Sequence, residues 1–381
     1  MDTPKPVYIH NIHTAVPETA YSQADAGEVM LREVDPESRG GRLMRRIYRD
    51  SGIDKRHSVI RDLKGAETNT QIDSKSDQAN TFFDATDGRF KSPSTGARNA
   101  IYAKEARTLF SETARGALEG CPQFNADQVT HVITVSCTGF FAPGPDFYVV
   151  KDLGLSPSVE RFHVGFMGCY AAFPAMKMAK AFCASDENAV VLIVCLELCS
   201  LHIEPSEEID AILACSVFAD GAGAMIVSSK KPPGPGAIRM DHFNSVITPN
   251  SEGDMAWTIG DKGFDMVLST YVPKILEANT AHIVDDVLRR TGMNRSDIDC
   301  WAVHPGGRAI LDKIQKGLTL QNDALNASRS VLRDYGNMSS ATILFVLDRM
   351  RKLETTPNNA AVFAMAFGPG LTVETAVLSI L

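Results

Sequence analysis

Short apolar runs rich in β-branched residues alternate along this chain with longer helix-like segments, and this alternation constrains the fold more than any other feature. The predicted strands are 129–136, 189–194, 223–227, 299–303, 360–366 and 371–381. The predicted helices are 103–118, 171–182, 271–291 and 340–352. Continuous apolar strands are typical of sheets covered on both faces, so the pattern predicts an α/β fold with largely buried sheets.

A run of lysine, proline and glycine at 230–236 is the clearest break in the pattern, and it lies near the middle of the 381-residue chain. We therefore expect two similar halves, 1–235 and 236–381. The segment 67–94 is polar and rich in Asp, Ser and Thr, which predicts a surface excursion from the first half.

Composition excludes several classes of protein. The formal net charge of −8 gives no overall reason to bind nucleic acid. No apolar run reaches the roughly 18 to 20 residues that cross a bilayer, and the first residues lack a signal-peptide pattern, so we expect neither membrane insertion nor secretion. The eight cysteines form no CxxC and no zinc-like spacing with histidine. They read as free thiols in a reducing cytoplasm, with no metal site.

One cysteine stands apart from that reading. Cys169 follows an apolar strand and a glycine, and it precedes a predicted helix of small residues. A helix N-terminus favours a thiolate through its unpaired N–H groups and its dipole. Alone, the same pattern also fits simple packing.

Two further segments join a reactive side chain to a tight turn. His304 ends a predicted buried strand before Pro-Gly-Gly, and Asn337 lies in Gly-Asn-Met-Ser-Ser before a predicted helix. Each has a structural alternative: a core histidine, and an asparagine that caps the helix or takes a left-handed turn. Together with Cys169 they fit a nucleophile, its ion-pair partner and an oxyanion donor, a set that papain-like proteases also use.

The longer motifs point elsewhere, because the chain closely resembles the chalcone and stilbene synthases, the type III polyketide synthases. The strongest matches are His-Pro-Gly-Gly at 304–307, Tyr-Gly-Asn-Met-Ser-Ser at 335–340 and Phe-Gly-Pro-Gly-Leu-Thr-Val-Glu-Thr at 367–375. Cys169, His304 and Asn337 fall at the family's catalytic positions, and Phe218 falls at its first gatekeeper phenylalanine.

The resemblance implies a thiolase fold of two similar αβαβα halves in five layers, in a homodimer. It also implies the reaction. An acyl group passes from coenzyme A to Cys169, malonyl-CoA loses carbon dioxide and extends it, and the polyketide cyclises. No metal or redox cofactor is implied; acyl-CoA and malonyl-CoA are substrates.

The pocket residues differ from those of plant chalcone synthases. Met266 replaces a usual gatekeeper phenylalanine, Trp257 replaces a small glycine, and Cys199 replaces a threonine. The implied substrate-binding positions are Phe218, Met266, Trp257, Cys137, Thr138, Cys199, Ser339, Gly368 and Pro369. These differences argue against naringenin chalcone as the product.

For coenzyme A, the resemblance assigns Arg46 to a basic phosphate-binding position and the Ala309 N–H to a pantetheine contact. Leu43 and Asp50 stand where plant members have lysines. The individual phosphate contacts are therefore left open.

Thr138 and Cys199 match positions that open an acyl tunnel in bacterial alkylpyrone and alkylresorcinol synthases, which favours a fatty acyl-CoA starter. Ile203 narrows that tunnel, and Cys137 supports the alternative of tetrahydroxynaphthalene synthesis from malonyl-CoA alone. Two other readings remain at this point. One is a ketoacyl-acyl carrier protein synthase of the initiating type, and the other is a non-catalytic thiolase-fold binding protein.

Overall fold

The computed structural model describes residues 5–61, 81–84, 86–249 and 251–381. The strands are β1 (Tyr8–Ala15), β2 (Ala20–Ser22), β3 (Lys55–His57), β4 (His131–Ser136), β5 (Glu160–Gly165), β6 (Val190–Leu198), β7 (Asp220–Ser228), β8 (Ile238–Ile247), β9 (Met255–Gly260), β10 (Gly263–Leu268), β11 (Cys300–Val303), β12 (Ala360–Gly368) and β13 (Thr372–Ile380). The helices are α1 (Gln23–Leu31), α2 (Arg39–Asp50), α3 (Thr95–Glu119), α4 (Pro145–Leu153), α5 (Ala172–Ser185), α6 (Ile209–Val217), α7 (Val272–Thr291), α8 (Arg308–Leu318), α9 (Asn326–Tyr335) and α10 (Thr342–Arg351). Every helix and strand predicted from the sequence is confirmed, although α3 begins at Thr95, well before the predicted start at 103. The other ends are displaced by a few residues.

The main sheet is mixed, with nine strands in the order β11-β12-β13-β8-β1-β7-β6-β4-β5. Strands of the first half and of the second half meet where β1 pairs with β8, at Tyr8 opposite Arg239 and Ile9 opposite Ile238. This short junction was not predicted, because nothing local in either strand specifies a partner so distant in sequence. The division at 235/236 falls in the connection between β7 and β8 and stays a prediction.

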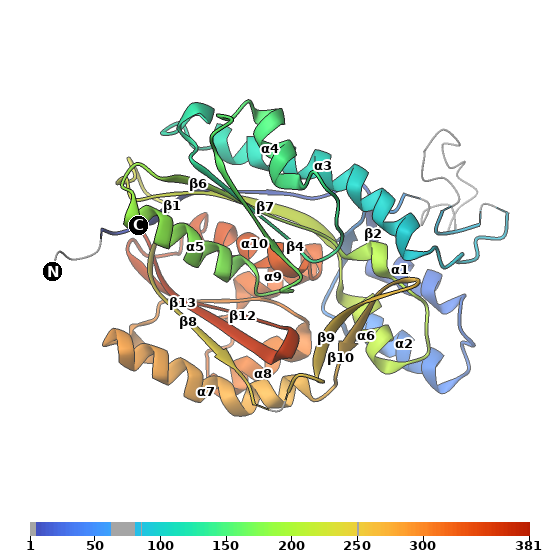
Figure 1. Ribbon diagram of the computed structural model, residues 1–381. Coiled ribbons are helices and arrows are strands. Elements are labelled where there is room, and N and C mark those ends of the chain that lie inside the picture. The colour runs from blue at the N-terminus through green and yellow to red at the C-terminus, as the bar shows by residue number, and fades with distance from the viewer. Residues whose placement is uncertain (1–4, 62–80, 85, 250) are drawn as a thin grey trace.

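Five layers are visible in Figure 1, as expected for the thiolase fold. Helices α3 and α4 cover the strands of the first half, α7 and α8 cover those of the second half, and α5 and α10 lie between the two groups of strands. Both faces of the central strands are therefore buried. Strand β6 shows this directly, because Val190, Leu192 and Val194 pack with α3 while Val191, Ile193 and Cys195 face the middle layer.

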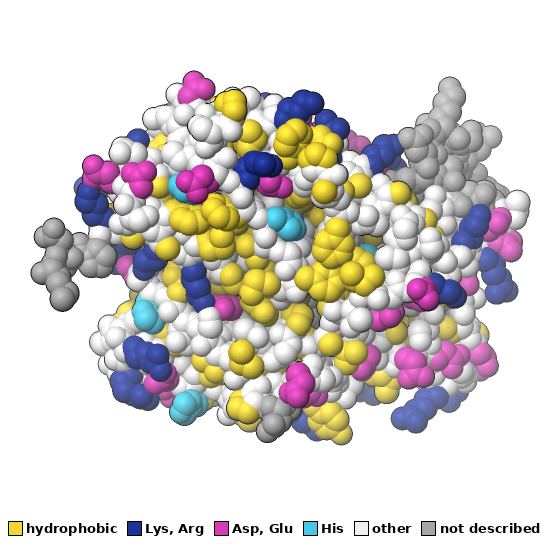
Figure 2. Space-filling view, viewed as in Figure 1, with side chains coloured by type: hydrophobic (Ala, Val, Ile, Leu, Met, Phe, Trp, Pro, Cys, Tyr) yellow, Lys and Arg dark blue, Asp and Glu magenta, His cyan; other side chains and the backbone are white. Residues whose placement is uncertain are grey.

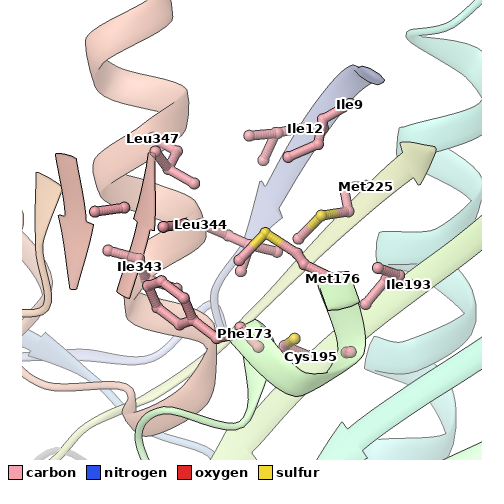
Figure 3. Packing of buried hydrophobic residues seen from close by; sticks show 14 of the residues in the cluster. Ile9, Ile12, Phe173, Met176, Ile193, Cys195, Met225, Ile343, Leu344 and Leu347 are labelled. Atoms are coloured by element: carbon pink, nitrogen blue, oxygen red, sulfur yellow. The ribbon is translucent and has the colours of Figure 1, made fainter. Parts of the chain in front are cut away.

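The middle layer is the core that joins the halves. Phe173 and Met176 of α5 meet Ile343 and Leu344 of α10, with Ile193 of β6 beside them (Figure 3). All five side chains are fully buried. Burying a large apolar side chain contributes about 1.5–3 kcal/mol, so this contact holds the loops at the ends of α5 and α10 in fixed relation.

A repeated local pattern supports the expectation of similar halves. Asn125 and Asn294 each open a short 3₁₀ turn with a capping box, closed by Gln128 and Asp297 respectively. In each half this turn follows the long outer helix, α3 or α7, and leads into a buried strand, β4 or β11.

The polar excursion expected at 67–94 lies largely outside the described residues. Within its described part, Phe82 and Phe83 are buried, and Arg98 lies 5.4 Å from the Phe82 ring centroid. Thr86, Asp87, Arg89 and Lys91 are exposed, so this part is anchored by the two phenylalanines and otherwise lies on the surface.

Candidate active site

Cys169 lies in the turn between β5 and α5, three residues before the helix begins. Gly168 has a φ of +81°, a conformation that L side chains rarely adopt, and a Cβ there would lie 2.5 Å from Pro369 Cδ. Gly368 is equally constrained, because a Cβ would lie 2.5 Å from Tyr170 Cδ1. The two glycines allow the segment 367–375 to pack closely against the turn that carries Cys169.

His304 directly follows β11, and its N–H donates to the Met365 carbonyl at 2.8 Å. The side chain is only 1% exposed. Neither of its ring nitrogens has a hydrogen-bond partner among the described residues. A buried, unpartnered imidazole is uncommon, and it leaves both nitrogens available to a substrate or to the thiol.

Asn337 is held by its backbone and by its side chain. Its N–H donates to the Val217 carbonyl and its carbonyl accepts from the Ala219 N–H, both at 2.8 Å. Its Oδ1 accepts from the Ser339 N–H at 2.9 Å, while Nδ2 donates to the Gly306 carbonyl at 3.3 Å. The bond to Oδ1 fixes which end of the amide faces the cavity.

A single cavity brings the three predicted catalytic side chains together, with about 40 Å³ of open space at its centre. Of the predicted substrate-binding residues, it is lined by Cys137, Thr138, Cys199, Phe218, Trp257, Met266, Ser339 and Pro369. Gly368 does not line this cavity. It lies beside the cavity, packed closely against Tyr170 as described above. The lining that sequence reasoning missed is Gly168, Met255, Leu268, Gly306, Ile310 and Phe367.

The surroundings of the triad favour uncharged groups. Burial raises the pKa of the Cys169 thiol to about 11, and hydrogen bonds with Ser339 and Asn337 act in the opposite direction. Burial alone lowers the pKa of His304 to about 3. Burial thus acts against the thiolate–imidazolium pair expected from the sequence, and the helix N-terminus acts in favour of the thiolate.

A buried carboxylate supports the cavity floor, and sequence reasoning missed it. Glu197 is fully buried and accepts from the Cys137 N–H and the Thr138 hydroxyl, both at 2.9 Å, and from the Ser340 hydroxyl. Burial raises its pKa. The sequence signal was present, since Glu197 is the one charged residue in the apolar run of β6.

The hairpin β9–β10 closes one side of the cavity. Trp257 and Met266 face each other across it, and the Trp257 Nε1–H donates to the Cys137 carbonyl at 2.8 Å. His202 stacks on Phe264 with ring centroids 4.0 Å apart and meets the Trp257 ring edge-on. This aromatic group fixes Trp257 as a wall of the cavity.

The cavity continues outward into a cleft of about 400 Å³ between α2 and the N-terminus of α8. Leu268, Gly306 and Ile310 line both spaces and form the neck between them. Arg46 and Ala309, the residues predicted to contact coenzyme A, line this outer cleft. Arg308 also lines it and was not predicted.

No helix in the described part of the chain is long and apolar enough to span a membrane. No cluster of three or more His, Cys, Asp or Glu side chains is arranged to hold a metal ion among these residues.

The whole chain matches known proteins. A sequence model of chalcone and stilbene synthases matches residues 5–231 with its N-terminal domain and 240–381 with its C-terminal domain. The α-pyrone synthesis polyketide synthase-like Pks18 of Mycobacterium tuberculosis is 30% identical over 374 residues, covering 96% of this chain and 89% of the relative.

Solved structures of other polyketide synthases superimpose on this chain. PKS-I from the brown alga Ectocarpus siliculosus superimposes with a TM-score of 0.91 at 28% identity, covering 100% of both chains. The 1,3,6,8-tetrahydroxynaphthalene synthase of Streptomyces coelicolor A3(2), a bacterial type III polyketide synthase, superimposes with a TM-score of 0.85 at 25% identity, covering 98% of this chain and 99% of the other.

Proposed function

The chain belongs to the chalcone and stilbene synthase family, the type III polyketide synthases, and we propose that Cys169, His304 and Asn337 carry out its condensation reaction. The observation that carries this assignment is their convergence on one apolar cavity from three separate loops. Members of this family are acyltransferases that use acyl-CoA and malonyl-CoA, so the proposed reaction needs no carrier protein.

In the loading step, Cys169 Sγ attacks the thioester carbon of the acyl-CoA. The thiol proton passes to a free ring nitrogen of His304, and the C–S bond to coenzyme A then breaks. The departing sulfur takes the proton back, which leaves an acyl-Cys169 thioester and neutral His304. Both nitrogens of His304 lack a protein partner among the described residues, which suits a proton carrier.

In the extension step, malonyl-CoA loses carbon dioxide and leaves an enolate on its thioester oxygen. The neutral His304 N–H and the Asn337 Nδ2–H are the proposed donors to that oxygen. Such a donor is worth about 2.7–4 kcal/mol in a site shielded from water. The enolate carbon then attacks acyl-Cys169, which forms the new C–C bond, breaks the C–S bond and releases Cys169 as a thiolate.

Phe218 is proposed to favour the decarboxylation itself. Its ring lines the cavity and offers no hydrogen bond to a carboxylate. A charged carboxylate beside it is poorly solvated, while neutral carbon dioxide is not, so the ring raises the ground state relative to the product.

For the starter we propose a fatty acyl-CoA, with alkylpyrone or alkylresorcinol products. A second space of about 40 Å³ lies behind Phe218, which lines both cavities. Its lining includes the apolar side chains of Ile203, Met30 and Cys215 and the polar side chains of Arg56, His57, Ser58 and Ser200. An acyl chain could extend past Phe218 into it. The Pks18 relative is described by α-pyrone synthesis, which agrees.

Tetrahydroxynaphthalene synthesis from malonyl-CoA alone is the second candidate. The narrow space at the centre of the main cavity and the Cys137 thiol in its wall favour it. Incubating the enzyme with malonyl-CoA, with and without acyl-CoAs of increasing length, separates the two by mass spectrometry. Tetrahydroxynaphthalene as the sole product would overturn the fatty acyl proposal. Strict dependence on a carrier protein would contradict the proposed use of free CoA thioesters.

We also propose a homodimer that works in the cytoplasm. Strand β5 is the last strand of the main sheet, and Phe140 and Phe147 near it are 42% and 39% exposed. Hydrophobic side chains gather in patches across the face that carries α5 (Figure 2). All eight cysteines are free, as in a reducing compartment.

A further inference from the structure

The second space, behind Phe218, is partly enclosed by the loop that follows β6. Ile203 of this loop lines the second space, and Cys199, four residues earlier, lines the main cavity. If the proposed function holds, an acyl chain that extends past Phe218 meets the Ile203 side chain in that space. The position of Ile203 therefore decides how much room the chain finds.

A single buried arginine holds this loop by its backbone. Arg98, in the first turn of α3, is fully buried. Its Nη1 donates to the Leu201 carbonyl and to the Ile203 carbonyl, both at 2.7 Å. A buried carbonyl that lacks a donor is costly, so these two bonds fix the path of the loop at Ile203.

The other donors of Arg98 are taken by groups that orient its guanidinium. Nη2 donates to Glu204 Oε2 at 2.8 Å, and Nε donates to the Pro93 carbonyl at 2.7 Å. Glu204 Oε1 in turn accepts from the Ser92 hydroxyl at 2.6 Å. Arg98 therefore uses four of its five N–H groups, and Glu204 is the acid paired with it.

The Glu204 carboxylate matters because the cation that it pairs with is so deeply placed. Arg98 has no exposed side-chain surface, whereas the Glu204 side chain is 38% exposed. The rings of Phe82 and Phe90 have centroids 5.4 and 5.9 Å from Arg98 Cζ and shield it from water. A buried guanidinium is stable only when it is paired. Loss of the Glu204 charge therefore favours movement of Arg98 toward solvent and away from the two loop carbonyls.

We propose that Arg98 and Glu204 are positioning residues for the acyl starter, and that the pair limits starter length by fixing Ile203 against the second space. The inference rests on the proposed use of an acyl-CoA starter and deepens it by naming the residues that set its length. Neither Arg98 nor Glu204 lines the main cavity, so the pair acts on the starter only through the loop.

The test compares kcat/KM for hexanoyl-CoA and lauroyl-CoA as starters, with malonyl-CoA as the extender. Glu204→Gln keeps an oxygen for the Ser92 hydroxyl and removes the charge paired with Arg98. It should raise the ratio of kcat/KM for lauroyl-CoA to that for hexanoyl-CoA by about fivefold, because Ile203 is then free to move out of the second space. Arg98→Lys should shift the ratio the same way, since an ammonium group cannot reproduce the planar fork of the guanidinium. Malonyl-CoA decarboxylation should keep its wild-type rate in both variants.

Ile203→Ala supplies a second measurement, because the pair is proposed to act through this side chain. It should itself raise the ratio, and adding Glu204→Gln to it should change the ratio little further. Arg351→Lys is the matched control. Arg351 is also largely buried, lies 2.7 Å from Asp348 and donates to the Ile12 carbonyl at 2.8 Å, but it lines neither space. It should keep the wild-type ratio.

Three results would overturn the inference: unchanged or lower ratios in both Glu204→Gln and Arg98→Lys, an equal shift in Arg351→Lys, or additive shifts when Glu204→Gln is combined with Ile203→Ala. Thermal unfolding accompanies each measurement, and Glu204→Gln alone decides the matter where Arg98→Lys is unfolded. Failure of the proposed function looks different, because the wild type would then extend neither acyl-CoA.

Discussion

Phe218 and Asn337 are joined by an isolated parallel β-bridge. The bridge consists of the two 2.8 Å backbone hydrogen bonds of Asn337 to the residues on either side of Phe218. The proposed decarboxylation ring and the proposed oxyanion donor are therefore positioned by one backbone contact, although more than a hundred residues separate them in the sequence. A change that moves one should move the other.

A substitution at Gly336, which directly precedes Asn337, should disturb that bridge. Its φ is +74°, and a Cβ would lie 3.0 Å from the Val217 carbonyl and 2.9 Å from Arg56 Cγ. Gly336→Ala should lower kcat at least tenfold and destabilise the fold by about 1–3 kcal/mol, because strain and crowding both act beside Asn337. Gly292→Ala is the control, with φ +72° and open space around it. It should lose stability while keeping kcat, and equal kcat losses in both variants would refute the argument.

The proposal that His304 and Asn337 donate to the enolate oxygen predicts that loss of either residue slows the same step. His304→Gln and Asn337→Ala should each slow malonyl-CoA decarboxylation by about 100- to 1000-fold, because each removes or displaces a donor to the enolate oxygen. Release of labelled carbon dioxide measures this directly, and CoA binding by calorimetry checks that the site persists. Decarboxylation at the wild-type rate in both variants would remove these residues from the step.

Trp257 is predicted to limit product size. Trp257→Gly should shift the products toward more extensions or longer starters, because the indole fills one wall opposite Met266. Trp257→Phe keeps most of the bulk and loses only the bond to the Cys137 carbonyl, so its products should resemble those of the wild type. Mass spectrometry of the products checks both. An identical product profile in Trp257→Gly would show that this wall does not set the limit.

His202 predicts a pH dependence of stability. Burial lowers its pKa to about 4, and its ring is fixed as neutral because Nε2 donates to the Thr138 carbonyl while Nδ1 accepts from the Phe264 N–H. The unfolded chain, with an ordinary histidine pKa near 6.5, then binds the proton more readily. The stability is therefore complete above pH 6.5 and falls as the pH drops toward 4, by roughly 1–3 kcal/mol for this residue.

Denaturant unfolding at pH 7.5 and pH 5 measures this loss. His202→Gln should flatten the dependence, whereas His282→Gln, a change at an exposed position on α7, should leave it as in the wild type. His10 and His304 act in the same direction, with pKa values lowered to about 4 and about 3, so some dependence remains in both variants. A full wild-type slope in His202→Gln would contradict the assignment.

The sequence alone predicted the elements and the three residues that share the cavity, because these depend on local patterns. Apolar runs and helical spacing specify β6 or α7 without reference to the rest of the chain, and the motifs around His304 and Asn337 are contiguous. Cys169, His304 and Asn337 were expected to share a site, and they line one cavity.

What could not be predicted depends on long-range packing. The junction of β1 with β8 involves strands far apart in sequence, and the outer cleft forms only when α2, α6 and α8 are assembled. The helix N-terminus at Cys169 is visible in the sequence, whereas the burial that raises the pKa of its thiol is not. The close approach of Gly368 to Tyr170 is likewise a long-range contact, and the assignment of Gly368 to substrate binding stays a prediction.

The central claim is that Cys169 carries the growing chain. The most direct measurement is peptide mapping by mass spectrometry after brief incubation of the enzyme with an acyl-CoA, in the wild type and in Cys169→Ala, with Cys300→Ala as the control outside the cavity. The account predicts an acyl adduct on Cys169 in the wild type and in Cys300→Ala, and neither adduct nor product in a folded Cys169→Ala. An adduct on Cys137 or Cys199 instead, or undiminished product from Cys169→Ala, would contradict it.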